Sequence, residues 1–158
     1  MAEGDVRSTH NPEIVSCDDN NEDGVQINCF TEDLESYTLH FQIIRLQKQI
    51  FVWIGCNSAK FGHLYAAAPF ALRKSQNSMV SVASILGGAS DNTGSSIARR
   101  LVLKTGLNIV LACNIPKNSP MLEADAEKIL IQKLRSLGYA RPKSEGSPVP
   151  LSKVESRT

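Results

Sequence analysis

The sequence predicts an α+β domain: a two-layer α/β sandwich in which two helices lie on one face of a single, mainly antiparallel six-stranded sheet. Apolar and polar residues alternate through most of the first half of the chain, which is the period of a strand, and a helical period appears from Ile97 onward. The predicted order is five strands, a helix, a sixth strand and a second helix. This order differs from the regular alternation of strands and helices in a doubly wound fold.

The first three strands are predicted between residues 25 and 56. Residues 25–29 alternate, residues 31–35 are expected to turn the chain, and residues 37–43 show the clearest alternation in the sequence. After a short polar connection, residues 50–56 form an almost wholly apolar strand. Connections this short favour antiparallel neighbours.

Two further strands and a helix are predicted next. The strands are expected at residues 64–73 and 79–86, and Pro69 favours a bulge or an edge position because it has no backbone N–H. In the helix, the apolar residues between 97 and 105 recur at helical spacing. Gly106 is well placed to end this helix, because glycine readily adopts the left-handed conformation found there.

The last strand and the last helix complete the predicted domain. Residues 107–114 form the strand. Ser119 and Pro120 open the helix with a capping residue and a proline at the first helical position, its apolar face extends to Leu137, and Gly138 ends it.

Charge divides the chain of 158 residues into three parts. Residues 1–23 hold seven acidic residues and one basic residue, a net charge of −6, and are predicted to form a disordered acidic tail. Residues 140–158 are rich in Pro, Ser, Lys and Glu and are predicted to form a second flexible tail. We therefore expect one folded domain over residues 24–139.

Composition excludes several classes of protein. The overall net charge of +1 argues against a protein whose main task is to grip the phosphates of nucleic acid. No apolar run approaches the ~20 residues of a membrane helix, and the N-terminus is acidic where a signal peptide would be basic and then apolar. The four cysteines form no C-x-x-C pair for zinc or thiol exchange. We expect a protein of the cytoplasm or the nucleus with no membrane, metal or cofactor.

Catalytic residues are not apparent. The histidines His10, His40 and His63 have no nucleophile signature beside them, although Cys56 and His63 could meet by folding. The glycine-rich residues 87–94 precede a helix, where backbone amides could hold a phosphate. They match neither of the usual phosphate-binding motifs, and a turn followed by a helix cap explains them more simply. An enzyme is therefore not expected.

The predicted sheet has more apolar residues than its two helices can cover. In residues 50–56, Ile50, Val52 and Ile54 point to one side while Phe51 and Trp53 point to the other, so both sides avoid water. Two helices of ~10 Å diameter cover one face of a sheet about 29 Å wide and leave the other face bare. Either a partner protein or the region around residues 61–64 must cover it. Trp53 could belong to that bare face or to the core.

Basic residues mark a second surface. Arg99, Arg100 and Lys104 lie on the polar side of the predicted first helix. Such a face can meet nucleic acid or an acidic protein surface, and most often it is only solvated. A small RNA-binding domain that uses this helix face and the open sheet is the alternative function, although no aromatic residues interleave with the basic ones.

Several short motifs resemble those of one known family. They are FVWIG at residues 51–55, SILG at 84–87, SDNT at 90–93, IARRL at 97–101 and KT at 104–105. Their identity and order are similar to the proteasome assembly chaperone 4 family, over roughly residues 26–137.

The resemblance implies a non-enzymatic chaperone with a two-layer α/β domain. It implies a heterodimer with a related small chaperone, a proteasome assembly chaperone 3-like subunit, that promotes assembly of the α-subunit ring of the proteasome core particle. Because pairing in the family is expected through sheet surfaces, Phe51, Trp53 and His40 are the candidate residues for the chaperone partner. Arg99, Arg100 and Lys104 are the candidates for the proteasome α-subunits.

Overall fold

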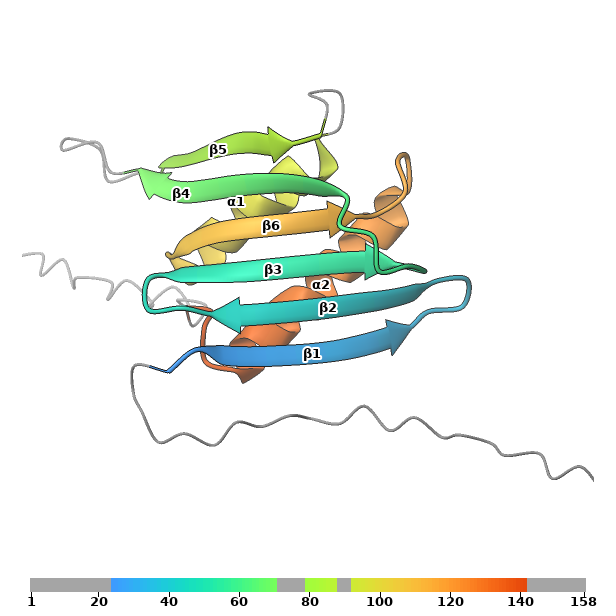
Figure 1. Cartoon of the computed structure of the whole chain (residues 1–158), viewed down its shortest axis with the longest axis horizontal. Coiled ribbons are helices and arrows are strands. Elements are labelled where there is room, and N and C mark those ends of the chain that lie inside the picture. Colours follow the sequence, from blue (N-terminus) through green and yellow to red (C-terminus); the bar gives the residue numbers. More distant parts are fainter. Residues whose placement is uncertain (1–23, 71–78, 88–91, 142–158) are drawn as a thin grey trace, which may run out of the picture.

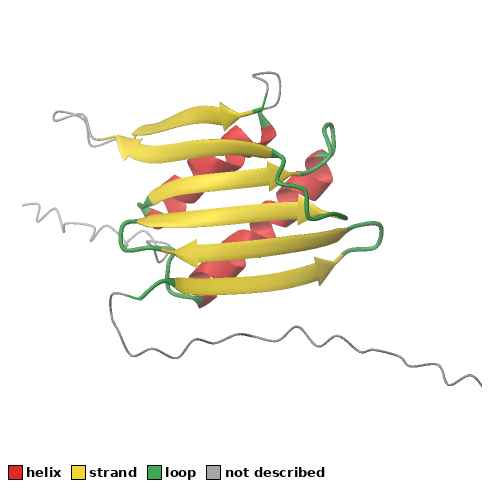
Figure 2. Cartoon of the chain, viewed as in Figure 1, coloured by secondary structure: helices red, strands yellow, loops and turns green. Residues whose placement is uncertain are grey.

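The computed structural model describes residues 24–70, 79–87 and 92–141, which form a six-stranded sheet with two helices on one of its faces (Figures 1 and 2). This confirms the predicted fold class and the predicted order of elements. The elements are β1 (Gln26–Asp33), β2 (Thr38–Arg45), β3 (Gln49–Cys56), β4 (His63–Phe70), β5 (Met79–Leu86), α1 (Thr93–Thr105), β6 (Asn108–Asn114) and α2 (Pro120–Ser136).

The strands lie in the order β1-β2-β3-β6-β4-β5. Every neighbouring pair is antiparallel except β3 and β6, which are parallel. The short connection between β2 and β3 thus joins antiparallel neighbours, as predicted. Because β6 lies between β3 and β4, the last strand of the sequence occupies the centre of the sheet, where both of its faces need cover.

One local prediction differs from the structure. The first strand continues to Asp33, and the turn begins only at Leu34, whose N–H donates to the carbonyl of Tyr37 at 2.7 Å. β1 tolerates the exposed polar residues at its end because it is an edge strand. The prediction for Pro69 is confirmed in its edge form: Pro69 stands beyond the last residue of β4 that pairs with β6, and the irregularity of β4 lies between Leu64 and Tyr65.

The helix ends follow the predicted signals. Gly106 adopts a left-handed conformation with φ 70°, and its N–H donates to the carbonyl of Val102 at 2.7 Å. Pro120 begins α2 directly after Ser119, and Gly138 follows the last turn with φ 77°. Neither Asn92 nor Ser119, at the two N-cap positions, makes a side-chain capping bond.

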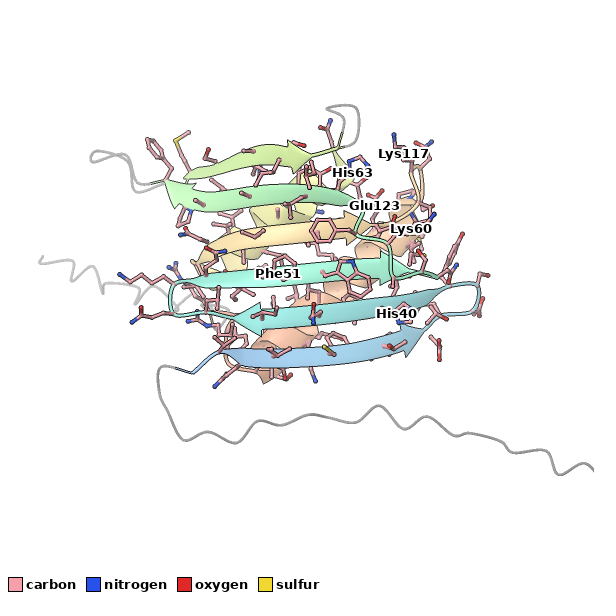
Figure 3. All side chains as sticks on the ribbon, viewed as in Figure 1. His40, Phe51, Lys60, His63, Lys117 and Glu123 are labelled. Atoms are coloured by element: carbon pink, nitrogen blue, oxygen red, sulfur yellow. The ribbon has the colours of Figure 1, made fainter. Side chains whose placement is uncertain are left out.

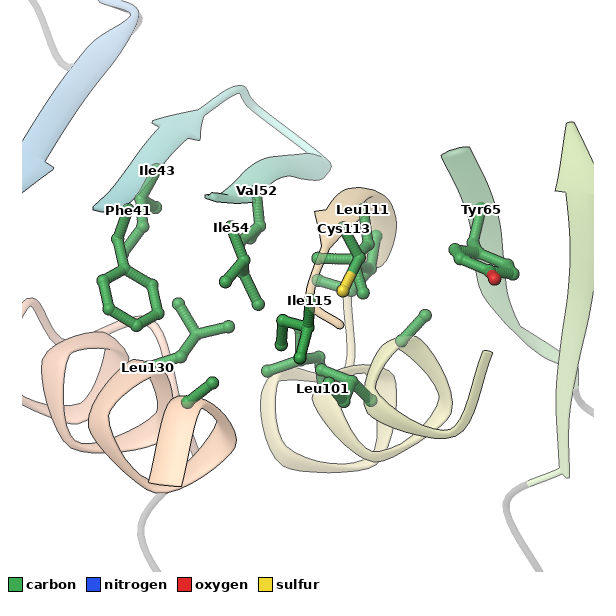
Figure 4. Packing of buried hydrophobic residues seen from close by; sticks show 14 of the residues in the cluster. Phe41, Ile43, Val52, Ile54, Tyr65, Leu101, Leu111, Cys113, Ile115 and Leu130 are labelled. Atoms are coloured by element: carbon green, nitrogen blue, oxygen red, sulfur yellow. The ribbon is translucent and has the colours of Figure 1, made fainter. Parts of the chain in front are cut away.

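The core lies between the sheet and the helices (Figure 4). α1 packs on the half of the sheet formed by β4, β5 and β6, and α2 lies beneath the half that contains β1 and β2. Leu101 of α1 and Leu130 of α2 are fully buried, and Phe41 and Ile54 meet them from the sheet. This layer accounts for one face of the sheet only.

The limits of the predicted domain fall largely outside the structure. Residues 1–23 and 142–158 lie outside the described residues, so their assignment as tails stays a prediction. In the described part of the chain, neither helix has the length and the apolar character to cross a membrane.

Core packing gives a first prediction on one helix. Leu101 is fully buried, whereas Leu103 on the same helix is 48% exposed. Leu101→Ala should lower the free energy of unfolding by about 2–5 kcal/mol because it removes buried methyl groups and leaves a cavity. Leu103→Ala, the matched control, should change it by less than about 0.5 kcal/mol. Urea denaturation followed by circular dichroism measures both, and equal losses would contradict the described packing.

Candidate protein-binding surface

The face of the sheet opposite the helices is the candidate site. In the part of the chain that the structure describes, no helix lies over it, and Figure 3 views it directly with His40 and Phe51 labelled. β3 shows the predicted two-sided character. Ile50, Val52 and Ile54 are fully buried on the helix side, while Phe51 and Trp53 are half-buried on the other. Trp53 therefore belongs to the open face and not to the core.

Strand register lines up one apolar residue from each strand across this face. Phe51 of β3 stands opposite Ile44 of β2 and Val110 of β6, and the pairing continues outward to both edges. We call this set the central row: Ile27, Ile44, Phe51, Val110, Ala66 and Ala83. Ile27 at the edge is 54% exposed. The row is apolar from one edge of the sheet to the other.

A second row runs beside the first, displaced from it by two residues on every strand except β5, where the irregularity in the β4–β5 pairing makes the displacement three. It contains Trp53 next to Gln42 and Ala112, and its members are Cys29, Gln42, Trp53, Ala112, Leu64 and Leu86. None of the twelve residues in the two rows is charged. Six strands at ~4.8 Å and two rows that are each about 7 Å deep give a footprint of roughly 400 Å². A monomer rarely leaves so large an apolar patch exposed without a use for it.

Trp53 is held in a fixed position at one end of this face. Its indole N–H donates to the carbonyl of Lys60 at 3.1 Å, and its ring stacks with that of His40 at 6.5 Å between centroids. A Cβ atom on Gly55 would collide with the Trp53 ring and lie 2.7 Å from the carbonyl oxygen of Ser58. Only glycine leaves room for this arrangement, which gives a physical reason for the W-x-G motif.

His40 is oriented as well as stacked. Its Nδ1 lies 3.1 Å from the hydroxyl of Thr31 on the neighbouring strand β1. His40, Gln42, Trp53 and Ala59 line a shallow hollow of about 350 Å³ on the open face. The structure thus brings the three predicted partner-face residues, His40, Phe51 and Trp53, to one side of the sheet.

The loop of residues 57–62 borders the open face at its Trp53 end and leaves the rest of the face uncovered. Asn57 anchors the loop, because its side-chain oxygen accepts from the Thr38 N–H at 2.8 Å and its own N–H donates to the Thr38 carbonyl at 2.9 Å. Asn114 donates to the hydroxyl of Ser58 at 3.2 Å. Phe61 itself is 45% exposed. This region therefore covers only the Trp53 end of the face.

The basic residues of α1 lie on the opposite layer of the molecule. Arg99 donates to the carbonyl of Val80 on β5 at 3.2 Å, and Arg100 pairs with Glu127 of α2 at 2.6 Å. Lys104 stands in the last turn, where its charge complements the helix dipole. These residues and the open face do not form one continuous surface, which is what the RNA-binding alternative would require.

The remaining chemical candidates do not assemble into a site. Among the described residues, no three His, Cys, Asp or Glu side chains gather as metal ligands do. Cys56 lies on the buried side of β3, where burial raises the pKa of its thiol. A raised pKa makes the thiolate scarcer near neutral pH and the residue a weaker nucleophile. Residues 88–91 of the glycine-rich segment lie outside the described residues.

Sequence reasoning found Phe51 and Trp53 but missed most of the surface around them. Ile44, Val110 and Ala66 join Phe51 only through strand pairing between distant segments, which periodicity does not reveal. The W-x-G spacing is a signal that could have pointed to the Gly55 contact.

Comparisons with known proteins point to one family. A sequence model of the family described as proteasome assembly chaperone 4 matches residues 38–115. Human proteasome assembly chaperone 4 is 30% identical over 91 residues, which cover 58% of this chain and 70% of the human protein. A chain from the crystal structure of a chaperone complex for yeast 20S proteasome assembly is 16% identical. It has a TM-score of 0.52, with 68% of this chain and 97% of that chain covered, and shows the same fold.

Cysteine reactivity tests the two sides of the sheet. Cys29 is exposed on the open face, whereas Cys56 and Cys113 are buried. A water-soluble maleimide should modify Cys29 within minutes at neutral pH and leave Cys56 and Cys113 unmodified until urea unfolds the chain. Peptide mapping by mass spectrometry measures each site. Rapid modification of Cys56 in the folded protein would contradict its position under the helices.

Proposed function

The chain belongs to the proteasome assembly chaperone 4 family, and we propose that it is a chaperone that promotes assembly of the proteasome core particle by binding and not by catalysis. The two uncharged rows of the open face carry this proposal. They offer a large apolar surface for another protein, and no set of reactive groups gathers on them. Similarity to human proteasome assembly chaperone 4 supports the same role.

The partner proposed for the open face is a related small chaperone, a proteasome assembly chaperone 3-like subunit, in a heterodimer. Burial of roughly 400 Å² of apolar surface on this chain contributes about 10 kcal/mol. This offsets much of the 4–15 kcal/mol that association costs, before the matching surface of the partner is counted. Phe70 and Met79 pair with each other at the end of β4 and β5, four residues from the central row. Both are half-exposed and extend the surface toward a standard interface.

The α-subunits of the proteasome core particle are proposed to bind the helix layer. Arg99, Arg100 and Lys104 lie there, on the side that stays accessible when the open face is covered. Charged residues at such a surface speed association and fix orientation more than they add affinity. One domain can thus bind the chaperone partner and a proteasome subunit at the same time.

Affinity purification of the tagged chain from its own cells tests the function and the face together. The wild-type chain should recover a second small chaperone and proteasome α-subunits. Phe51→Glu should weaken binding of the chaperone by about 100-fold or more, because it buries an unpaired charge in the interface. Recovery of neither protein by the wild-type chain would contradict the proposed function.

The matched control is Leu103→Glu, which places the same charge at a half-exposed position on α1. It should leave recovery of the small chaperone unchanged, and both variants should keep the helical and strand signals of the wild-type chain in circular dichroism. Equal binding of the chaperone by wild type and Phe51→Glu would place the partner elsewhere on the molecule.

Charge reversal on α1 tests the second surface. Arg99→Glu combined with Lys104→Glu should lower the association rate with the isolated α-subunit ring about tenfold at 0.1 M salt, while the dissociation rate changes little. The difference should shrink at 1 M salt, because the Debye length is then only about 3 Å and charges further apart no longer attract each other. Surface plasmon resonance measures both rates. Lys60→Glu, in the loop that borders the open face, serves as the control, and an equal effect of this control would reject the helix layer as the contact.

A further inference from the structure

One end of the domain carries a large excess of positive charge. At this end β2 and β4 finish and both helices reach their C-termini (Figure 1). We call it the basic end, and its charged residues are Arg45, Lys48, Lys104, Lys133, Arg135 and Arg141. The acidic residues of the described chain all lie elsewhere, near the β1–β2 turn or in the first half of α2: Glu32, Asp33, Glu35, Glu123, Asp125 and Glu127.

Several contacts hold the members of the basic end together from distant parts of the chain. Arg45 pairs with Gln26 at the start of β1, and its guanidinium lies 5.6 Å from the ring centroid of Tyr139. The N–H of Arg141 donates to the carbonyl of Lys104 at 2.8 Å. The end of β2, the end of α1 and the segment after α2 therefore meet at one place.

Helix dipoles account for only a small part of this charge. Basic residues are favourable in the last turn of a helix, and each helix C-terminus is equivalent to about −0.5 of an elementary charge. Two C-termini balance about one of the six cations. Arg45 is the last residue of β2 and Lys48 lies in the turn after it, so neither residue belongs to a helix end. About five positive charges of the basic end are therefore not balanced by the helix dipoles and are available to another anion.

The sequence supplies that anion at the same end. Residues 1–23 carry a net charge of −6 and connect to β1 beside Arg45. Asp18, Asp19, Glu22 and Asp23 are the acidic residues nearest the domain. Asp23 precedes Gln26 by three residues, which span only about 10 Å when extended. Chain length therefore puts Asp23 within reach of the basic end, and allows Asp18, eight residues before Gln26, a span of at most about 28 Å.

We propose that residues 1–23 bind the basic end within the same molecule and prevent it from binding polyanions. Charges of nearly equal size and opposite sign meet across a short connection. The connection gives the segment an effective concentration in the millimolar range. A nucleic acid or another acidic macromolecule must displace the segment before it reaches the basic end. The segment thereby limits non-specific electrostatic binding by a chain whose described part is basic.

A spin label on Cys17 tests the contact directly in the full chain. Cys29→Ser removes the exposed cysteine of the described residues, among which Cys56 and Cys113 are buried. At 0.1 M salt the label should broaden the amide signals of Arg45 and Lys48 in NMR spectra. At 1 M salt the signals should return, because the Debye length is then only about 3 Å and the charges no longer hold the segment in place. The amide of Lys117, at the other end of the sheet (Figure 3), is the control. Broadening that does not respond to salt would show mere proximity and overturn the proposal.

Binding of a fluorescent 20-nucleotide oligothymidylate, measured by anisotropy, tests the consequence. A full-length variant without three of the segment's charges should bind this probe at least tenfold more tightly than wild type at 0.1 M salt. The substitutions are Asp19→Asn, Glu22→Gln and Asp23→Asn.

A control variant changes net charge by the same amount at the opposite end. Its substitutions are Glu32→Gln, Glu35→Gln and Asp125→Asn. It should gain less than threefold, because the removed charges do not face the basic end. An equal gain in affinity for the oligonucleotide in both variants would show that net charge alone causes the effect and would overturn the proposal. No gain in either variant would also overturn it.

Discussion

The structure depends on one imbalance: two helices cover one face of a sheet whose central strands are apolar on both faces. β3 and β6 lie side by side in the middle of the sheet, and each places large apolar residues on the helix side and further apolar residues opposite. Burial on the helix side stabilises the fold. The residues on the other side, Phe51 and Val110 among them, gain nothing comparable within the chain. The same sequence feature that builds the sheet thus creates a surface that favours a partner.

That surface is held rigid before any partner arrives. Gly55 lets the Trp53 ring lie flat against the strand, and the Lys60 carbonyl fixes the indole N–H. Asn57 ties the neighbouring loop to β2 through two hydrogen bonds with Thr38. A surface already in its bound conformation loses little conformational entropy on association. A moderate apolar area can therefore support a stable complex.

Much of the fold could be predicted from the sequence, because strands and helices follow local periodicity. Gly106 marked the end of α1, and the alternation of β3 placed Phe51 and Trp53 on one side together. Strand order could not be predicted, since β6 enters the sheet between β3 and β4 through pairing over long sequence distances. Membership of the central row depends on that order.

The same limit explains why the basic end was not predicted. Arg45, Lys104 and Arg141 lie far apart in the sequence and meet only because β2, α1 and the segment after α2 finish at one end of the sheet. Sequence reasoning grouped Lys104 with Arg99 and Arg100 on a single helix face. In the structure Arg99 and Arg100 make contacts with β5 and α2, while Lys104 lies next to Arg141.

Apolar and charged surfaces are separated in this molecule, and the separation divides their tasks. The two rows of the open face contain no charge, so a complex formed there is insensitive to salt and dissociates slowly when its apolar area is large. The helix layer and the basic end carry charges that act over longer distances and are screened by salt. Contacts of the second kind form and break quickly, which suits the transient binding that we propose for a proteasome subunit. A chain with the opposite arrangement, charged toward the proposed chaperone partner and apolar toward the proposed proteasome subunit, would separate from the chaperone first and retain the subunit.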